Sequence, residues 1–145
     1  MSYWLMKSEP DTYSIDDLAA QPRKTDHWDG IRNYQARNFM RDMKIGDKGF
    51  FYHSNKGLEV VGIVEVCAES AQDKTTDDER WDCVDIKAVC DMPDPVTLKA
   101  VKANEKLEDM ALVTSFRLSV QPVKEDEWME VCRMGGLNGK TLKPL

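Results

Sequence analysis

The sequence lacks the apolar runs, glycine-rich loops and basic leader that would assign it to several common classes of protein. No apolar stretch reaches the roughly 18 residues that a membrane-spanning helix needs. The first residues do not combine a basic segment with an apolar one, so we expect no signal peptide and a cytoplasmic location. The glycines fit neither the G-x-G-x-x-G nor the Walker spacing, and the sequence therefore predicts no phosphate-binding loop.

Cysteine and histidine are scarce, and their spacing argues against a metal centre. The chain has four cysteines, of which no two form a C-x-x-C pair, and only two histidines. A structural zinc site needs about four such ligands at regular spacing. We interpret the cysteines as free thiols in a reducing compartment, and we expect neither a metal ion nor a cofactor.

Positive charge is also in deficit. The formal net charge is −6 over 145 residues, whereas tight binding of duplex nucleic acid needs many cationic contacts to phosphate. A small group of Lys and Arg on one face is compatible with this charge. The length fits a single domain, 1–145, and hydrophobic residues make up 41% of the chain, which is enough for a core. We expect a monomer.

Apolar periodicity predicts an α+β domain, either a small curved β-barrel or a strongly curved sheet, with flanking helices. We expect strands at 3–8, 48–55, 58–70, 83–89 and 116–123. We expect helices at 14–21, 33–46 and 125–134. Polar connections should fill 22–30, 71–80 and 92–110, with one helical turn near 98–103, and the tail 136–145 should be frayed.

The segment HWDGIRNYQARNFM, residues 27–40, concentrates groups that bind planar ligands. Trp28 could stack on a base, Gly30 would let backbone approach it closely, and Asn33 could read its polar edge. Arg32 lies near an expected helix start, where free N–H groups favour an anion. The alternative is that Trp28 belongs to the core, Asn33 only caps the helix and the arginines face solvent.

A basic stripe follows on the helix expected after Asn33. Arg37, Arg41 and Lys44 recur at i, i+4 and i+7, so they share one face of that helix. Together with Arg32 they are our candidates for phosphate binding.

Three further places carry polar or aromatic groups. FYHSN, residues 51–55, could line the mouth of a barrel or simply form a turn. A nucleophilic pair of Ser54 and His53 would need a bend, because neighbours on a strand point to opposite faces. Trp81 lies off the apolar face of its strand, and it either covers a helix or lines a pocket. Arg117 could face solvent, pair with an acid or enter the pocket.

Five segments, taken in order, resemble the EVE domain family and its bacterial single-domain members. They are WLMKSEP, WDGIRNYQARNFMRDMKIGD, FFYHSN, RWDCVDI and SFRLSVQPV. The resemblance extends over residues 3–134. It implies a PUA-like fold related to the YTH domains, and binding of a flipped modified base in an aromatic-lined pocket, without catalysis.

The resemblance also assigns ligand-binding roles residue by residue. The implied positions are Lys7, Ser8, Trp28, Gly30, Arg32, Asn33, Tyr34, Tyr52, His53, Ser54, Asn55, Trp81, Ser115 and Arg117. Within this set we expect Trp28 and Trp81 to be the stacking walls. Asn33 and Ser8 should read the edge of the base, and Lys7 should join the phosphate contacts.

We therefore expect a non-catalytic module that holds one modified base of DNA or RNA, either a modified cytosine or a methylated adenine. Two other classes compete. An enzyme or metabolite-binding protein would use the same pocket for a nucleotide-like ligand, with His53 and either Tyr52 or Ser54 as the reacting groups. A protein adaptor would instead present an exposed apolar patch and no pocket.

Overall fold

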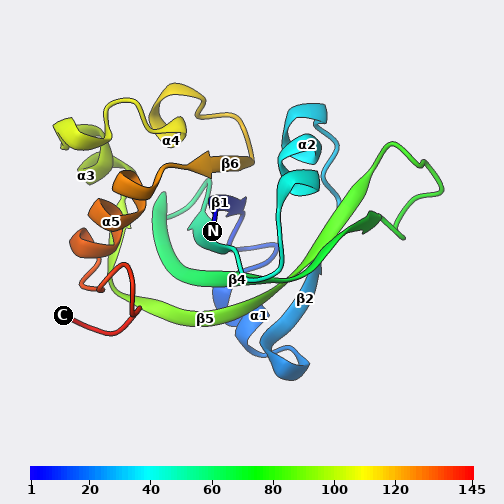
Figure 1. The fold of residues 1–145 in the computed structure, drawn as a ribbon, viewed down its shortest axis with the longest axis horizontal. Coiled ribbons are helices and arrows are strands. Elements are labelled where there is room, and N and C mark those ends of the chain that lie inside the picture. Colours follow the sequence, from blue (N-terminus) through cyan, green and yellow to red (C-terminus); the bar gives the residue numbers. More distant parts are fainter.

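Six strands form one mixed sheet in a computed structural model that describes all residues, 1–145 (Figure 1). The strands are β1 (Tyr3–Ser8), β2 (Thr25–Trp28), β3 (Lys48–His53), β4 (Glu59–Gln72), β5 (Asp82–Thr97) and β6 (Val120–Val123). The α-helices are α1 (Ile15–Ala19), α2 (Tyr34–Asp42), α3 (Leu98–Ala103), α4 (Ala111–Thr114) and α5 (Glu125–Met134). Two 3-10 turns are η1 (Pro22–Lys24) and η2 (Glu105–Leu107). None of the helices combines the length and hydropathy required to cross a bilayer.

The sheet is curved but does not close into a barrel. Its order is β2-β5-β4-β3-β1-β6, so β2 and β6 are free edges. Only β1 and β3 run parallel, and every other pair is antiparallel. The ladder between β4 and β5 shifts register at four places, and such bulges bend strands. The predicted α+β domain with flanking helices is confirmed, and of the two predicted forms the strongly curved sheet is the one observed.

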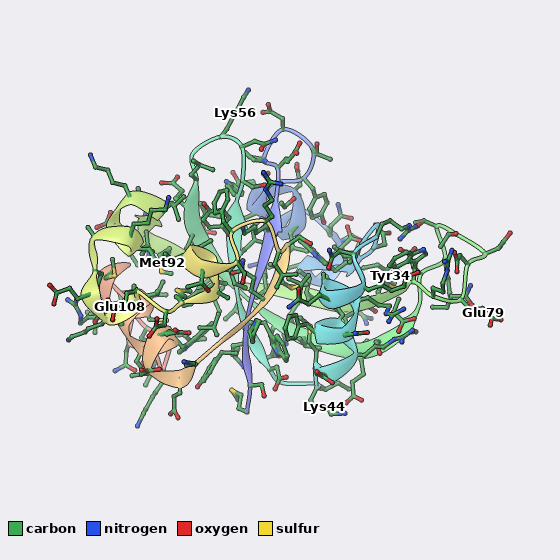
Figure 2. All side chains as sticks on the ribbon, turned by 90° about the horizontal axis from the view of Figure 1, so that it is seen from above. Tyr34, Lys44, Lys56, Glu79, Met92 and Glu108 are labelled. Carbon is green, nitrogen blue, oxygen red and sulfur yellow. The ribbon has the colours of Figure 1, made fainter.

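Alternation along the central strands gives the sheet two apolar faces. Leu5 and Phe50 point to one face, which α3, α4 and α5 cover. Met6 and Phe51, their chain neighbours, point to the other face, which α1 and α2 cover. Figure 2 shows α2 and the α3–α5 group on opposite sides of the strands. Because both faces are buried, the strands read as nearly continuous apolar runs.

Two strand segments were predicted as loops. Residues 25–28 form β2, whose Trp28 lies opposite Val84 of β5. Only one of these four residues is apolar, so pairing with β5 rather than periodicity makes this segment a strand. Residues 92–97 extend β5, although they include two prolines. Proline is tolerated there because this part of β5 pairs with β4 alone and leaves its other side unpaired.

The tail 136–145 is packed rather than frayed. Leu137 is buried and forms a β-bridge with Pro144. The indole Nε1 of Trp128, in α5, donates a hydrogen bond of 2.9 Å to the carbonyl oxygen of Gly139. The prediction of a frayed tail is wrong. The tail is held by a contact with Trp128 of α5, which the sequence alone does not reveal.

Candidate functional site

A pocket of about 500 Å³ opens at the carboxyl ends of β1 and β2. Residues 7–9, 12–13 and 26–29 line it, together with Ile31. Of the residues that sequence reasoning proposed for ligand binding, the pocket brings together Lys7, Ser8 and Trp28. The remaining lining residues come mainly from β2 and from the loop before α1.

Trp28 is both a core residue and a wall of this pocket. Its exposed fraction is 8%, and its ring packs edge-on against Phe51 and Tyr13, with centroid distances of 5.5 and 6.5 Å. The pairing of Trp28 with Val84 on β5 fixes the position of its backbone. A place in the core and a place in the pocket wall, the two alternatives drawn from the sequence, are therefore compatible for Trp28.

Hydrogen bonds hold one carboxylate of the pocket in place. Asp26 accepts a bond of 2.6 Å from the Tyr13 hydroxyl and one of 2.7 Å from the His27 amide. The Ser8 hydroxyl donates to the carbonyl oxygen of Tyr13 at 2.6 Å. Burial, followed by the hydrogen bond to Asp26, raises the pKa of Tyr13 above its ordinary value. Tyr13 therefore remains a neutral donor and keeps Asp26 oriented.

Asp29 is the second carboxylate that lines the pocket, and it differs from Asp26 in being free. No other residue donates a hydrogen bond to its side chain. Burial, and then the negative charges of Asp73 and Asp26, raise the pKa of Asp29 above its ordinary value. A carboxylate without a partner in a partly desolvated pocket is available to accept a hydrogen bond from a ligand.

The signature loop that contains Gly30 is anchored away from the pocket. Gly30 has a φ of 77°, which glycine adopts without strain, and its amide donates to Asp73 at 2.8 Å. Arg32 donates to the same carboxylate at 3.0 Å and to the Thr75 hydroxyl at 3.2 Å. Gly30 and Arg32 thus tie the loop to the hairpin between β4 and β5, and neither of them lines the pocket.

Trp81 lies apart from Trp28, in a separate cluster of arginines and aromatic rings. Its ring packs on Tyr34 with a centroid distance of 5.0 Å, and the Arg37 guanidinium lies 4.9 Å from the Tyr34 ring. The Arg32 guanidinium lies 5.7 Å from the Trp81 ring. Trp28 and Trp81 were both expected to be stacking walls, but only Trp28 lines the pocket of about 500 Å³. Trp81 instead covers the first turn of α2, the other alternative drawn from the sequence.

The basic stripe on α2 is largely neutralised by acids from β4 and β5. Arg41 pairs with Asp82 at 2.6 Å, and Lys44 lies 4.0 Å from Glu69. Arg37, by contrast, donates to the carbonyl oxygen of Arg80 at 3.0 Å and has no carboxylate partner. Arg37 and Arg41 lie on α2 as predicted, whereas Lys44 lies beyond its end at Asp42, so the predicted three-residue helical stripe is only partly formed. Partners from distant strands could not be seen in the sequence, and they weaken the case for Arg41 and Lys44 as phosphate ligands.

The FYHSN segment shapes a turn and the core rather than the pocket. Tyr52 is fully buried, and Asn55 adopts a φ of 66° in the turn. The Ser54 amide donates to the carbonyl oxygen of Ser8 at 2.9 Å. His53 accepts a bond of 3.2 Å at Nε2 from the Ile15 amide, and burial lowers its pKa. This nitrogen is therefore occupied, which argues against His53 as a general base for Ser54.

Three other predicted residues line a second hollow, of about 390 Å³. Asn33 borders it from the start of α2, and Ser115 and Arg117 border it from the segment between α4 and β6. The side chain of Asn33 also caps α2, since its Oδ1 accepts a bond of 2.9 Å from the Ala36 amide. Its predicted role as an N-cap is confirmed, and its oxygen is already used.

Sequence reasoning missed Tyr13, Asp26 and Asp29. The signal was present, because two acids flank Trp28 in the sequence, but residues 22–30 were interpreted as a polar loop. Alternation along β2 places Asp26 and Trp28 on one face, which identifies them as neighbours once the strand is recognised. No group of three or more His, Cys, Asp and Glu side chains is placed to hold a metal ion.

Comparison with known proteins places this geometry in a family. The EVE domain matches residues 2–134. Thymocyte nuclear protein 1 of Mus musculus is 40% identical, over 88% of this chain and 70% of its own length. A crystal structure of a protein from Agrobacterium tumefaciens is 64% identical, with a TM-score of 0.94, and the likeness covers 100% of this chain and 99% of that one.

A third likeness is to human THYN1 protein, whose crystal structure is of a complex with DNA that contains 5-methylcytosine. It is 36% identical, with a TM-score of 0.89, over 93% of this chain and 98% of that one. The open, curved sheet and its helices are the PUA-like fold that these relatives share. The family match over nearly the whole chain, together with these identities, shows that the chain belongs to the EVE domain family.

Proposed function

We propose that this chain binds DNA carrying 5-methylcytosine and holds the modified base in the pocket beside Trp28. The observation that carries the proposal is the meeting of the Trp28 ring and the free carboxylate of Asp29 in one pocket of about 500 Å³. The human relative in complex with 5-methylcytosine-containing DNA supports the choice of ligand. A base inside a duplex is inaccessible to such a pocket, so the base must be unpaired or flipped out of the stack.

The charge of the pocket favours a base over a phosphate. Glu9, Asp26 and Asp29 bring three carboxylates to its lining, against the single ammonium group of Lys7. A phosphate would be repelled, whereas the exocyclic amino group of cytosine is a donor that a carboxylate accepts. Asp29 is the candidate acceptor, because Asp26 is already bonded to Tyr13 and to the His27 amide. Thymine presents a carbonyl oxygen at that position and should be rejected.

The apolar side of the pocket provides the preference for the methyl group. Trp28 and Ile31 border the space, and each methyl group removed from water contributes about 0.8 kcal/mol. This corresponds to roughly a fourfold preference for 5-methylcytosine over cytosine. Stacking on the indole adds about 1–3 kcal/mol for either base and carries no such preference.

Fluorescence titration with short single-stranded oligonucleotides tests the proposal. Plain cytosine, 5-methylcytosine and thymine are compared at one central position in DNA, with RNA and N6-methyladenine versions as further arms. We expect 5-methylcytosine to bind more tightly than cytosine, and thymine to bind least. Asp29→Asn should reduce the discrimination between cytosine and thymine by about 5- to 150-fold. Asp42→Asn, which removes an exposed acid outside the pocket, is the matched control.

Each other outcome has a defined meaning. Equal binding of all bases would contradict the proposal, and tighter binding of N6-methyladenine or of RNA would replace its ligand. Recovery of a chemically altered oligonucleotide, detected by mass spectrometry, would establish an enzyme instead of a reader.

A further inference from the structure

An exposed phenylalanine lies beside the pocket and is surrounded by cations. Phe116, in the segment between α4 and β6 at the top of Figure 1, has an exposed fraction of 43%. The ammonium nitrogen of Lys7 lies 4.2 Å from the centre of its ring, and that of Lys102 lies 5.9 Å from it. Arg117 follows directly in the sequence. A ring of this kind is available to stack, and the cations around it are available to pair with phosphates.

These cations are not neutralised by a carboxylate, and among the cations near α2 they share this property only with Arg37. Lys7, Lys102 and Arg117 take part in no ion pair, whereas Arg32 and Arg41 are each paired with a carboxylate. The hollow that Phe116 borders contains no acid among its lining residues, and neither does the hollow of about 460 Å³ that Lys102 borders. On a chain with a net charge of −6, these two acid-free hollows are a local exception, while Lys7 also borders the pocket with its three carboxylates.

Two short segments connect this surface to the pocket. At the end of β1, Ser8 lines the pocket, while the preceding Lys7 reaches Phe116 and donates a hydrogen bond to its carbonyl oxygen. In the signature loop, Asp29 lines the pocket, and Asn33, four residues later, lines the hollow beside Phe116. The pocket and the ring are therefore neighbouring sites at one end of the sheet.

We propose that Phe116 stacks the base next to the one held in the pocket, while Lys7, Lys102 and Arg117 bind the phosphates of that strand. The partner is a single strand, or a duplex strand locally opened, whose next base is unstacked. This inference rests on the proposed function, since the pocket holds the first base. It assigns the phosphate contacts to this surface rather than to Arg41 and Lys44, which lie beside acids.

The Phe116 ring contributes little to the packing of the core, so replacing it can test the proposal. Phe116 belongs to neither apolar cluster of the core, and its contact with Lys7 includes the backbone carbonyl, which survives truncation of the side chain. Phe116→Ala should therefore fold, and circular dichroism and thermal melting would verify this.

An abasic substitution separates stacking from every other effect. Oligonucleotides carry one 5-methylcytosine and either a normal or an abasic nucleotide on its 5′ or its 3′ side. The wild-type protein should bind one of the two abasic oligonucleotides about 5- to 150-fold more weakly than the intact strand. Phe116→Ala should bind the intact strand with a similar loss and should be insensitive to that abasic position. Phe116→Trp should restore both the affinity and the sensitivity.

Salt dependence tests the cations. Each phosphate contact on a single strand contributes about 0.7 to the slope of log K against log salt concentration. Lys102→Gln and Arg117→Gln should each reduce that slope by about this amount. Lys143→Gln, which removes the same charge from the packed tail, should leave it unchanged.

The outcomes distinguish failure of this inference from failure of the proposed function. Preference for 5-methylcytosine over cytosine is a property of the pocket and should persist in Phe116→Ala. If that preference exists but Phe116→Ala binds like the wild-type protein, the proposed stacking on Phe116 is overturned and the proposed base pocket stands. If the wild-type protein shows no preference for 5-methylcytosine, yet Phe116→Ala loses the sensitivity to the abasic position, the base pocket is overturned and stacking on Phe116 stands. Absence of any binding overturns both.

Discussion

The buried carboxylate of Asp73 accepts a hydrogen bond of 2.8 Å from the amide of Gly30, which is 43 residues away in the sequence. The same carboxylate pairs with Arg32 at 3.0 Å, and its side chain is completely shielded from solvent. Thr75 adds two further bonds, from its amide at 2.8 Å and from its hydroxyl at 2.6 Å. One acid of the β4–β5 hairpin therefore fixes the loop that leads from the pocket to α2.

Removing the charge of Asp73 should loosen this anchor. Asp73→Asn keeps one acceptor oxygen but leaves several donors weakly satisfied in a buried place, so we expect a loss of about 1–3 kcal/mol in the free energy of unfolding. Urea denaturation measures this loss. Asp77→Asn, an exposed acid of the same hairpin, is the control and should remain within about 0.5 kcal/mol of the unmodified protein. Equal stability of the two variants would contradict the anchoring role.

The same residue should make stability depend on pH. Burial alone would raise the pKa of Asp73, but the hydrogen bonds from Thr75, Gly30 and Arg32 outweigh it and hold the pKa well below its ordinary value. The stabilisation is therefore complete above the unfolded pKa of about 3.9 and is lost as the pH falls below it. Melting temperatures measured from pH 7 to pH 3 should drop more steeply for the unmodified protein than for Asp73→Asn. Parallel curves would be evidence against this assignment.

Gly62 in β4 tolerates no side chain, because two elements approach it closely. A Cβ at this position would lie 2.1 Å from Cδ1 of Ile15 in α1 and 2.9 Å from the backbone carbonyl oxygen of Cys90 in β5. Gly62→Ala should cost about 1–3 kcal/mol of unfolding free energy, measured by urea denaturation. The double variant Gly62→Ala/Ile15→Val removes the clash with Ile15 Cδ1. It should restore only part of the lost stability, since the backbone carbonyl of Cys90 cannot move away. Full restoration would show that the strand contact is unimportant.

The stability of Trp28 variants should depend on the size of the side chain that replaces the indole. Trp28→Ala removes a buried ring that packs on Phe51 and Tyr13, so we expect a loss of about 3–5 kcal/mol in stability. Trp28→Phe fills more of the space and should fold, with weaker binding of 5-methylcytosine DNA in a fluorescence-independent assay such as anisotropy of a labelled strand. Unchanged binding by Trp28→Phe would argue that the indole is only a core residue.

Lys7 should give DNA binding a dependence on alkaline pH. Burial lowers the pKa of its ammonium group to about 8. A phosphate needs the protonated form, so affinity should fall as the pH rises through about 8. Lys7→Arg keeps its charge at these pH values and should flatten the dependence in anisotropy titrations from pH 7 to pH 9.5. An identical decline in Lys7→Arg would assign the effect to another group.

The elements that could be predicted are those whose signal lies within one short segment. Tyr3–Ser8 and Glu125–Met134 match their predicted bounds, because apolar spacing and helix-terminal residues are local features. β2 could not be predicted this way, since its strand character depends on hydrogen bonds to β5. The same limit applied to the candidate site, in which Arg32 and Arg41 pair with distant acids, and this pairing weakens the case for two expected phosphate ligands.

By itself, the sequence determined the α+β composition, the helix that Asn33 caps, and the loop in which Trp28, Gly30 and Arg32 stand close together. Tertiary structure decided which of these residues share a site. It separated Trp28 from Trp81, and it brought Lys7 to Phe116, which is 109 residues away. The physical reason is that local propensity and periodicity act over a few residues. The sheet order β2-β5-β4-β3-β1-β6 sets which charges meet and which rings face a pocket, and pairing between distant strands creates that order.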